Sequence, residues 1–420
     1  MAGLSNTFRS LNYRNFKLYF IGQSVSLVGT WMDRIAINWL VYTVSHSALM
    51  LGVVNFAGQI PTLLLSPYGG AISDRHDRYK ILITTQVCAM IEAGLMAALV
   101  FAHFYNMYAI IALSVMLGII NAFDTPSRQS LMVRLIEDKK DLQNAIALNS
   151  SMVNLARLLG PAVAGVLLST VGTGICFLLN SISFIAVIVC LLLMKLPPQQ
   201  KSKNTENIWQ GLVSGYKYLK GEQNIKLIIL LMAFISFFVM SYTTLMPVVA
   251  SDLFHGKAAT FSALNSVSGL GALLGAIYMA GLKSTENLRK TVIYASACFS
   301  LCIGLFAISG YLWLALIFML FSGTAMMMQI AGTNTYVQTN VSDQMRGRVL
   351  SYYVIAFLGM QPLGNFCVGF AAHYLGLRPV LLIEGIAGFV VAVIFGLFFK
   401  KFANRQVKVA GEDSATLTQP

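Results

Sequence analysis

Long apolar stretches alternate with short polar gaps along almost the whole chain. A helix needs about 20 residues to cross ~30 Å of hydrocarbon, and a bilayer leaves an open-ended segment only the helix for pairing its backbone groups. The pattern therefore predicts twelve transmembrane helices in two sets of six. The expected spans are 16–44, 48–73, 80–102, 107–132, 143–169, 172–195, 225–250, 259–282, 290–309, 311–340, 349–374 and 378–400.

Composition supports this class. Of the 420 residues, 57% are hydrophobic and 11% are charged, whereas about a quarter of a soluble protein is charged. These values exclude a soluble enzyme, a disordered chain and a disulfide-rich secreted domain. We expect an all-α integral membrane protein of two six-helix bundles, residues 1–195 and 225–400. A cytoplasmic linker with an amphipathic helix (196–224) joins the bundles, and a flexible cytoplasmic tail (401–420) follows them.

The basic residues predict the orientation. With the N-terminus in the cytoplasm, 24 of the 29 Lys and Arg residues fall on the cytoplasmic side, two (Lys257 and Arg378) fall outside, and three lie within spans. Such an excess is typical of the cytoplasmic face of a membrane protein. We therefore expect a multi-pass protein of the bacterial inner (plasma) membrane with both termini in the cytoplasm. The net charge of +13 then reflects a basic rim against the lipid bilayer, with no nucleic-acid partner.

Ionisable residues inside the spans are the first candidates for function. Each costs about 2.5 kcal/mol or more in hydrocarbon, so each needs a reason. Two interpretations stay open: Arg157 neutralises Asp33 or Glu92 and locks the helices, or one of these acids takes up and releases a proton. Neighbours on a helix point about 100° apart, so Asp33 and Arg34 cannot face one partner. The candidates for coupling or for lining a cavity are Asp33, Arg34, Glu92, Arg157 and Glu384.

A second group of charges lies at the cytoplasmic ends of spans 48–73 and 107–132. Asp124 lies at a depth that Arg75 or Arg78 could reach. Ion pairs that hold helix ends together in one conformation and separate in another act as a latch, and Gly70 would let the helices approach closely. The candidate latch residues are Gly70, Asp74, Arg75, Arg78, Asp124 and Arg128.

At these positions the chain resembles the major facilitator superfamily. Its signature loop between the second and third helices is matched by Gly70-x-x-x-Asp74-Arg75-x-x-Arg78. A motif of antiporters in the fifth helix is matched by Gly160-Pro161-x-x-x-Gly165. Three further segments resemble the branch that holds the enterobactin exporter and macrolide efflux pumps. They are Gly22-Gln23-Ser24 to Gly29-Thr30-Trp31, Phe123-Asp124-x-Pro126-x-Arg128 and Asn154-x-Ala156-Arg157-x-x-Gly160-Pro161.

The resemblance implies a proton-driven carrier whose two halves rock about a central cavity, with a latch that stabilises the outward-facing state. We expect a monomeric exporter of an amphipathic small molecule, such as a siderophore or a drug. Uptake of a nutrient or siderophore, or lipid flipping, stays open because the same fold serves these functions. The histidines and cysteines show no ligand spacing, so we expect no metal, no organic cofactor and no enzyme activity.

The second half differs from the signature. The loop after span 259–282 lacks the Asp-Arg pair of the first half. Coupling is therefore expected in the first half, and contacts to the transported molecule in the second. The candidates there are Tyr242, Gln329, Asn334, Tyr336, Gln361 and Asn365. The run Met326-Met327-Met328 in span 311–340 is a further candidate, because adaptable Met and aromatic surfaces suit bulky ligands.

Overall fold

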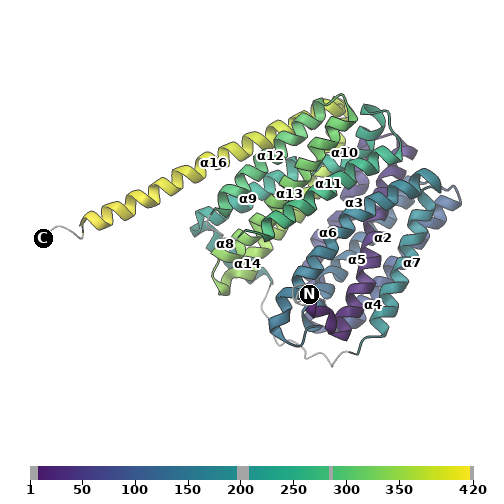
Figure 1. The fold of residues 1–420 in the computed structure, drawn as a ribbon, viewed down its shortest axis with the longest axis horizontal. Helices are drawn as coiled ribbons and strands as arrows, with labels where there is room; N and C mark the ends of the chain where they lie inside the picture. Colours follow the sequence, from purple (N-terminus) through teal and green to yellow (C-terminus); the bar gives the residue numbers. More distant parts are fainter. Residues whose placement is uncertain (1–7, 196–207, 283–286, 417–420) are drawn as a thin grey trace.

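The computed structural model describes residues 8–195, 208–282 and 287–416, and in those ranges the chain is helical, with no strand (Figure 1). A short 3-10 turn, η1 (Arg9–Asn12), precedes a first group of helices that pack on one another. They are α2 (Arg14–Ser45), α3 (Ala48–Arg75), α4 (Arg78–Phe101), α5 (Met107–Arg134), α6 (Lys139–Thr170) and α7 (Thr173–Leu192). Residues 196–207 of the predicted linker lie outside the described residues.

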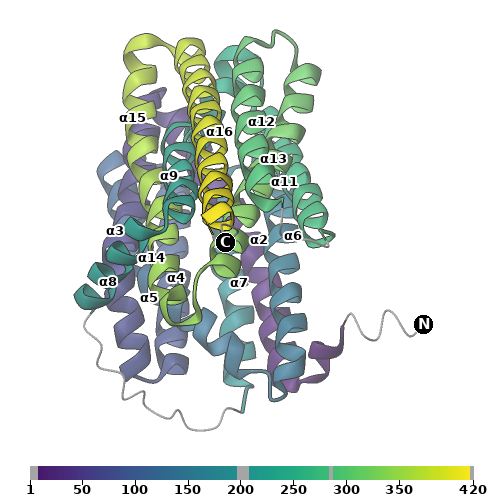
Figure 2. The same cartoon turned by 90° about the vertical axis from the view of Figure 1, so that its left-hand side faces the viewer.

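A second group follows the separate helix α8 (Ile208–Gly221). Its members are α9 (Gln223–Phe238), α10 (Tyr242–Val248), η2 (Val249–Leu253), α11 (Ala258–Ala280), α12 (Leu288–Ile308), α13 (Leu312–Asn340), α14 (Asp343–Val354), η3 (Ile355–Gly359), α15 (Met360–Leu375) and α16 (Leu377–Thr416). Within this group α16 packs along α12 and α9 (Figure 2). It continues as a helix to Thr416, past residue 400, where the sequence suggested the start of a flexible tail.

Eleven of the described helical segments are long and apolar enough to cross a membrane. The helix α2 has 32 residues but is not among them, because polar side chains such as Lys17, Gln23, Asp33 and Arg34 are spread along its length. The all-α membrane fold class predicted from the sequence is confirmed.

Two of the predicted spans, 225–250 and 349–374, cross as single segments but contain irregular turns. The first is divided among α9, α10 and the π-helix η2, and the second among α14, the π-helix η3 and α15. A proline has no N–H to donate, and its ring displaces the carbonyl four residues earlier. Pro247 lies inside α10, and Pro362 lies in the first turn of α15, four residues after Leu358 of η3. The apolar pattern alone did not predict these irregular turns.

The two groups meet mainly through α6 with α11 and through α3 with α15. Glycines bring the backbones together: a Cβ at Gly369 would lie 2.7 Å from the Ala48 carbonyl oxygen, and one at Gly165 would lie 2.6 Å from the Ser262 Cβ. All of these residues lie toward the end of the molecule formed by the α2–α3 turn. We call this the turn end, and the opposite one, where Arg14, Arg75 and Arg134 lie, the basic end.

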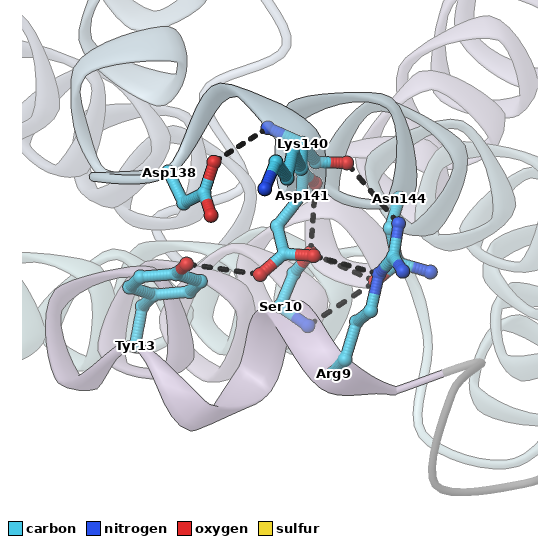
Figure 3. A network of polar contacts seen from close by, with 7 residues as sticks. All are labelled: Arg9, Ser10, Tyr13, Asp138, Lys140, Asp141 and Asn144. Atoms are coloured by element: carbon cyan, nitrogen blue, oxygen red, sulfur yellow. Dashed lines mark hydrogen bonds and ion pairs between the residues drawn. The ribbon is translucent and has the colours of Figure 1, made fainter.

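A polar network ties the start of the chain to α6 at the basic end (Figure 3). The Arg9 guanidinium lies 2.7 Å from the Asp141 carboxylate, and the Ser10 hydroxyl donates to the Asn144 side chain at 2.7 Å. The Tyr13 hydroxyl donates to Asp141 at 2.9 Å, and this hydrogen bond raises the pKa of Tyr13 above its ordinary value. The network fixes the start of the chain against the first turns of α6.

Candidate functional site

Two acids lie together in the interior of the first group. Asp33 of α2 is 6% exposed and Glu92 of α4 is 3% exposed, and the two carboxylates interact electrostatically. The Asn180 side chain, from α7, hydrogen-bonds Asp33. Among the described residues, neither acid forms an ion pair with a Lys or Arg, although the charge of Arg34 acts on Asp33 at longer range. We call Asp33 and Glu92 the acid pair.

Close packing of α2 on α7 builds the surroundings of the acid pair. Gly29 lies one turn before Asp33, and a Cβ there would lie 2.7 Å from both the Asn180 Oδ1 and the Ser183 Oγ. Because Gly29 has no side chain, α7 approaches closely enough for Asn180 to reach Asp33. Asn180 had no signal in the sequence, since one amide in an apolar run does not reveal its partner.

Arg34 faces the other way, toward the boundary between the two groups. Its guanidinium carbon lies 4.8 Å from the centroid of the Trp31 ring, and the residue is exposed. Arg157 of α6 lies over the same ring, at 5.5 Å. The Arg157 guanidinium also lies 3.7 Å from the sulfur of Met326 in α13 of the second group. Arg34, Arg157 and Trp31 form what we call the boundary cluster.

The motif in α6 positions this cluster. A Cβ at Gly160 would lie 2.3 Å from the Trp31 Cβ, so the bare glycine lets α6 press on α2 at this residue. Gly165 makes a similar approach to α11, and the buried Pro161 lies between the two glycines. The motif therefore lets α6 pack closely against α2 of the first group and against α11 of the second group. The first of the two sequence interpretations required Arg157 to pair with Asp33 or Glu92. Among the described residues, Arg157 forms no ion pair with either acid.

Asp124 lies in a buried polar site at the basic end of α5. Its carboxylate accepts hydrogen bonds from Gln86 at 2.7 Å and Thr85 at 3.1 Å, and it forms an ion pair with Arg128 at 3.2 Å. The Arg128 guanidinium also lies 3.4 Å from the Gln23 side chain of α2. Asp124 thus joins α4 to α5, and Arg128 links α5 to α2.

Other candidate latch residues lie elsewhere. Arg75 is exposed, and the Arg78 guanidinium donates to the Ser73 carbonyl at 3.1 Å, so neither meets Asp124 in this conformation. The Asp74 side chain lies outside the described part of the structure. The expectation for Gly70 was wrong, because a Cβ there would meet nothing within 4 Å.

The close approach occurs one residue earlier. A Cβ at Gly69 would lie 2.1 Å from the carbonyl oxygen of Ala122 in α5. Consecutive residues on a helix point about 100° apart, so only one of two adjacent glycines can face a given neighbour. The sequence could not tell which one does.

Glu384 lies alone in the second group. It is 3% exposed, and neither carboxylate oxygen has a hydrogen-bond partner in the part of the chain that the structure describes. It interacts electrostatically with Tyr242, whose hydroxyl lies 3.4 Å from the Ser268 hydroxyl. Tyr242 also interacts with Arg157 across the boundary, so this tyrosine lies between the boundary cluster and Glu384.

The remaining candidates for contacts to a ligand do not gather at one place. Gln329 is buried inside the second group, where its amide lies 3.1 Å from the Met232 sulfur. Asn365 is buried, and its backbone carbonyl packs against Gly52. Gln361 is half-buried at the start of α15. Asn334 and Tyr336 are half-buried near the basic end of α13, where Asn334 accepts from Gln338 at 3.0 Å.

Within the described ranges, no three His, Cys, Asp or Glu side chains gather so that they could hold a metal ion.

Comparison with known proteins identifies the family. The family described as "Transmembrane secretion effector" matches residues 5–415. The staphyloferrin A transporter of Staphylococcus aureus (strain NCTC 8325 / PS 47) is 29% identical over 404 residues, which cover 95% of this chain and 98% of that protein. Macrolide efflux protein A of Streptococcus pyogenes is 21% identical over 392 residues, covering 91% and 96%.

Solved structures agree on the fold. The crystal structure of a nucleoside transporter superposes with a TM-score of 0.75 at 13% identity, covering 91% of this chain and all of that one. The resemblance to the major facilitator superfamily, and to the branch with macrolide efflux pumps, is confirmed. Proteins of this kind move small molecules across membranes and are not enzymes. This chain therefore belongs to the transmembrane secretion effector family of the major facilitator superfamily and is a membrane transporter.

Proposed function

We propose that the protein is a proton-coupled exporter of amphipathic small molecules that works by alternating access. The observation that carries the proposal is the acid pair, which is buried in the first group without an ion-pair partner among the described residues. Two adjacent negative charges in a nonpolar interior are costly, and a proton bound by the pair removes part of that cost. A site that gains and loses a proton can be coupled to a conformational change.

Charge distribution supports the orientation. In the topology predicted from the sequence, 24 of the 29 Lys and Arg residues fall on the side of the membrane where the basic end lies. This end therefore faces the cytoplasm of a bacterial inner membrane, with both termini inside. In this arrangement α2 is a twelfth span. The spans form two six-helix bundles, which correspond to the two groups, and residues 196–224 link them on the cytoplasmic side. The protein acts as a monomer, with protons, lipid and a small molecule as its partners and no nucleic acid.

Contacts between the groups support an inward-open state. The Tyr42 hydroxyl of α2 donates to the Asp252 carboxylate of η2, and Trp39 stacks on Phe261 at 5.8 Å. These contacts lie at the turn end, as does the approach of Gly369 to Gly52. The molecule is thus closed on the outer side, and cargo enters from the cytoplasm. Export requires these contacts to separate while the basic ends approach.

The latch belongs to that second state. Asp124 is held by residues of its own group in this conformation, and Arg75 is exposed. When the basic ends approach, the loop that carries Asp74, Arg75 and Arg78 becomes able to engage the other group. The latch then stabilises the outward-facing state.

The names of the relatives support the kind of cargo and the direction. One relative transports staphyloferrin A and another is a macrolide efflux protein, so a siderophore or a drug is the cargo that we propose. Uptake by the same fold would reverse the direction of transport, and lipid flipping would replace the small molecule by a lipid. Both are outcomes of the vesicle experiment that would contradict export.

The test uses everted inner-membrane vesicles from cells that produce the full chain. Respiration acidifies the vesicle lumen, and the accumulation of staphyloferrin A, a macrolide and a fluorescent phospholipid is measured by mass spectrometry and fluorescence. We expect staphyloferrin A or the macrolide to enter the vesicles, and entry to stop when nigericin collapses the pH gradient. Entry that persists with nigericin and with valinomycin, which together collapse the pH gradient and the membrane potential, would exclude proton coupling. Accumulation only in right-side-out vesicles, or of the phospholipid alone, would contradict export of a small molecule.

A further inference from the structure

The boundary cluster places two guanidinium groups around one indole ring. Arg34 and Arg157 come from different helices, α2 and α6, yet their guanidinium carbons lie 4.8 and 5.5 Å from the centroid of Trp31. Each is a planar group with several N–H donors in a fixed fork. A molecule that lies against Trp31 is therefore within reach of both.

Within the described ranges, neither guanidinium forms an ion pair with a carboxylate. Arg157 contacts the Trp31 ring and the Met326 sulfur. The neighbouring Asp33 acts on Arg34, but Arg128 and Arg157 add positive charge nearby, and Arg34 and Arg157 repel each other. Cations at this depth normally pair with an anion, so two guanidinium groups at one ring favour a negatively charged ligand.

The surroundings of the cluster are aromatic and apolar. Met326 from α13 is 3% exposed and touches Arg157 from the side of the second group. Tyr242 of α10 lies on the same side and interacts with Arg157. Arg34, by contrast, is exposed, so the cluster is reachable from solvent on one side. The combination suits a ligand with an anionic group and an apolar or aromatic body.

We propose that Arg34 and Arg157 bind an anionic group of the cargo against Trp31, so that the substrates are amphipathic organic anions, such as carboxylates. The inference rests on the transport function proposed above and names the class of its substrate. It assigns the main ligand contacts to the first group, whereas the sequence placed them in the second. Met326 and Tyr242 complete the site from the second group.

The test compares two dyes built on the same xanthene ring but of opposite charge. Carboxyfluorescein is an anion at neutral pH, and rhodamine 123 is a cation. Their binding to the purified full chain in neutral detergent is measured by fluorescence anisotropy, with no membrane and no gradient. We expect carboxyfluorescein to bind at least about tenfold more tightly, because hydrogen bonds to charged groups contribute this much or more, and rising salt to weaken its binding.

Substitutions locate the site. Arg34→Gln and Arg157→Gln should each weaken carboxyfluorescein binding by about tenfold or more, whereas Arg34→Lys and Arg157→Lys keep the charge and should lose less. The matched control is Arg289→Gln, because Arg289 also lies over an aromatic ring, Phe399, at 5.4 Å, but in the second group. This control should bind as the unmodified chain does. Gel filtration and thermal unfolding show whether each variant is folded.

The result that overturns the inference is equal or tighter binding of rhodamine 123, or carboxyfluorescein binding that folded Arg34→Gln and Arg157→Gln chains keep in full. If a Gln variant does not fold, the Lys variant and the dye preference decide. Because the assay needs no proton gradient, it separates the two proposals. Selective anion binding without vesicle transport would contradict the proposed function alone, and vesicle transport without anion preference would contradict this inference alone.

Discussion

The interior of the first group and the boundary between the groups hold charge in opposite ways. In the interior, Asp33 and Glu92 lie side by side with an amide and no ion-pair partner among the described residues. At the boundary, Arg34 and Arg157 share an indole ring and face the second group. Asp33 and Arg34 are consecutive in α2. One turn of a single helix can thus carry a proton site on one face and an anion site on another.

The difference also separates what each region can do. The acid pair is shielded by α4 and α7, so it is suited to a proton and too enclosed for a larger ligand. The boundary cluster is open on one side and is contacted by the second group, so it changes when the groups move. Because the charge of Arg34 acts on Asp33, we expect an anion bound at the boundary cluster to change proton binding by the acid pair.

The largest expected effect comes from removing the acid pair. The double variant Asp33→Asn, Glu92→Gln keeps the shapes of both side chains but cannot bind or release a proton. Gradient-driven accumulation of cargo in everted vesicles should fall at least about tenfold, the ratio that corresponds to 1.4 kcal/mol. Glu137→Gln, at an exposed acid of the basic end, is the control. Full accumulation by the double variant would move the proton site away from the acid pair.

Next in size is a change at the turn end of the boundary. Gly369→Val inserts a side chain where even a Cβ would lie 2.7 Å from the Ala48 carbonyl oxygen and 2.8 Å from the Gly52 Cα. Overpacking of this kind costs about 1–3 kcal/mol, so the closed turn end should open in part of the population. Spin labels at the turn ends of α3 and α15 should show a longer distance than in the unmodified chain.

Gly347→Ala is the matched control for this variant, because a Cβ at Gly347 meets nothing within 4 Å. Its label distances should equal those of the unmodified chain. Unchanged distances in Gly369→Val would mean that this glycine contact does not hold the turn end closed.

The sequence was sufficient to predict the helices and to single out the ionised residues. Charges in apolar stretches are visible without any structure, and so are Gly160 and Gly165. The direction in which Asp33 and Arg34 point was not predictable, because it depends on the rotation of α2 about its axis. That rotation is set by contacts such as Gly29 with Asn180 and Gly160 with Trp31, which join residues more than 100 positions apart.

Packing between residues far apart in the sequence also explains the other differences between the sequence-based predictions and the structure. Gly69 and Gly70 are equivalent in the sequence, and only the packing of α3 on α5 distinguishes them. Glu384 was visible as a charge, but its lack of a hydrogen-bond partner depends on helices from the whole second group. Prolines 247 and 362 were present in the predicted spans, yet a proline inside a helix predicts a kink or a break without saying which.

A moderate effect is expected at Asp124. Asp124→Asn removes the ion pair to Arg128 and the negative charge that strengthens the hydrogen bonds from Gln86 and Thr85. Since these groups stay buried, the free energy of unfolding should fall by about 1–3 kcal/mol, measured by chemical denaturation in detergent. The same change at exposed Asp77 should cost less. Equal losses at both positions would show that the buried contacts of Asp124 stabilise the fold no more than an exposed carboxylate does.

The smallest expected effect is at Tyr42. Tyr42→Phe removes the hydroxyl that donates to Asp252 across the boundary and keeps the ring that lies near Trp39 and His46. The closed turn end should lose about 1 kcal/mol or somewhat more of stabilisation, seen as a small lengthening of the spin-label distance between the turn ends of α3 and α15. An unchanged distance would indicate that stacking of Trp39 on Phe261 is sufficient.

The central claim is that cargo movement and proton movement pass through the same first group of helices, and proton counterflow tests it most directly. Everted vesicles with an acidic lumen carry a dye that reports the lumenal pH, and staphyloferrin A or the macrolide is added outside. We predict that the lumen becomes less acidic with the unmodified chain and does not change with the Asp33→Asn, Glu92→Gln chain. A lumen that stays acidic while the unmodified chain accumulates cargo, or an equal pH change with both chains, would contradict the account.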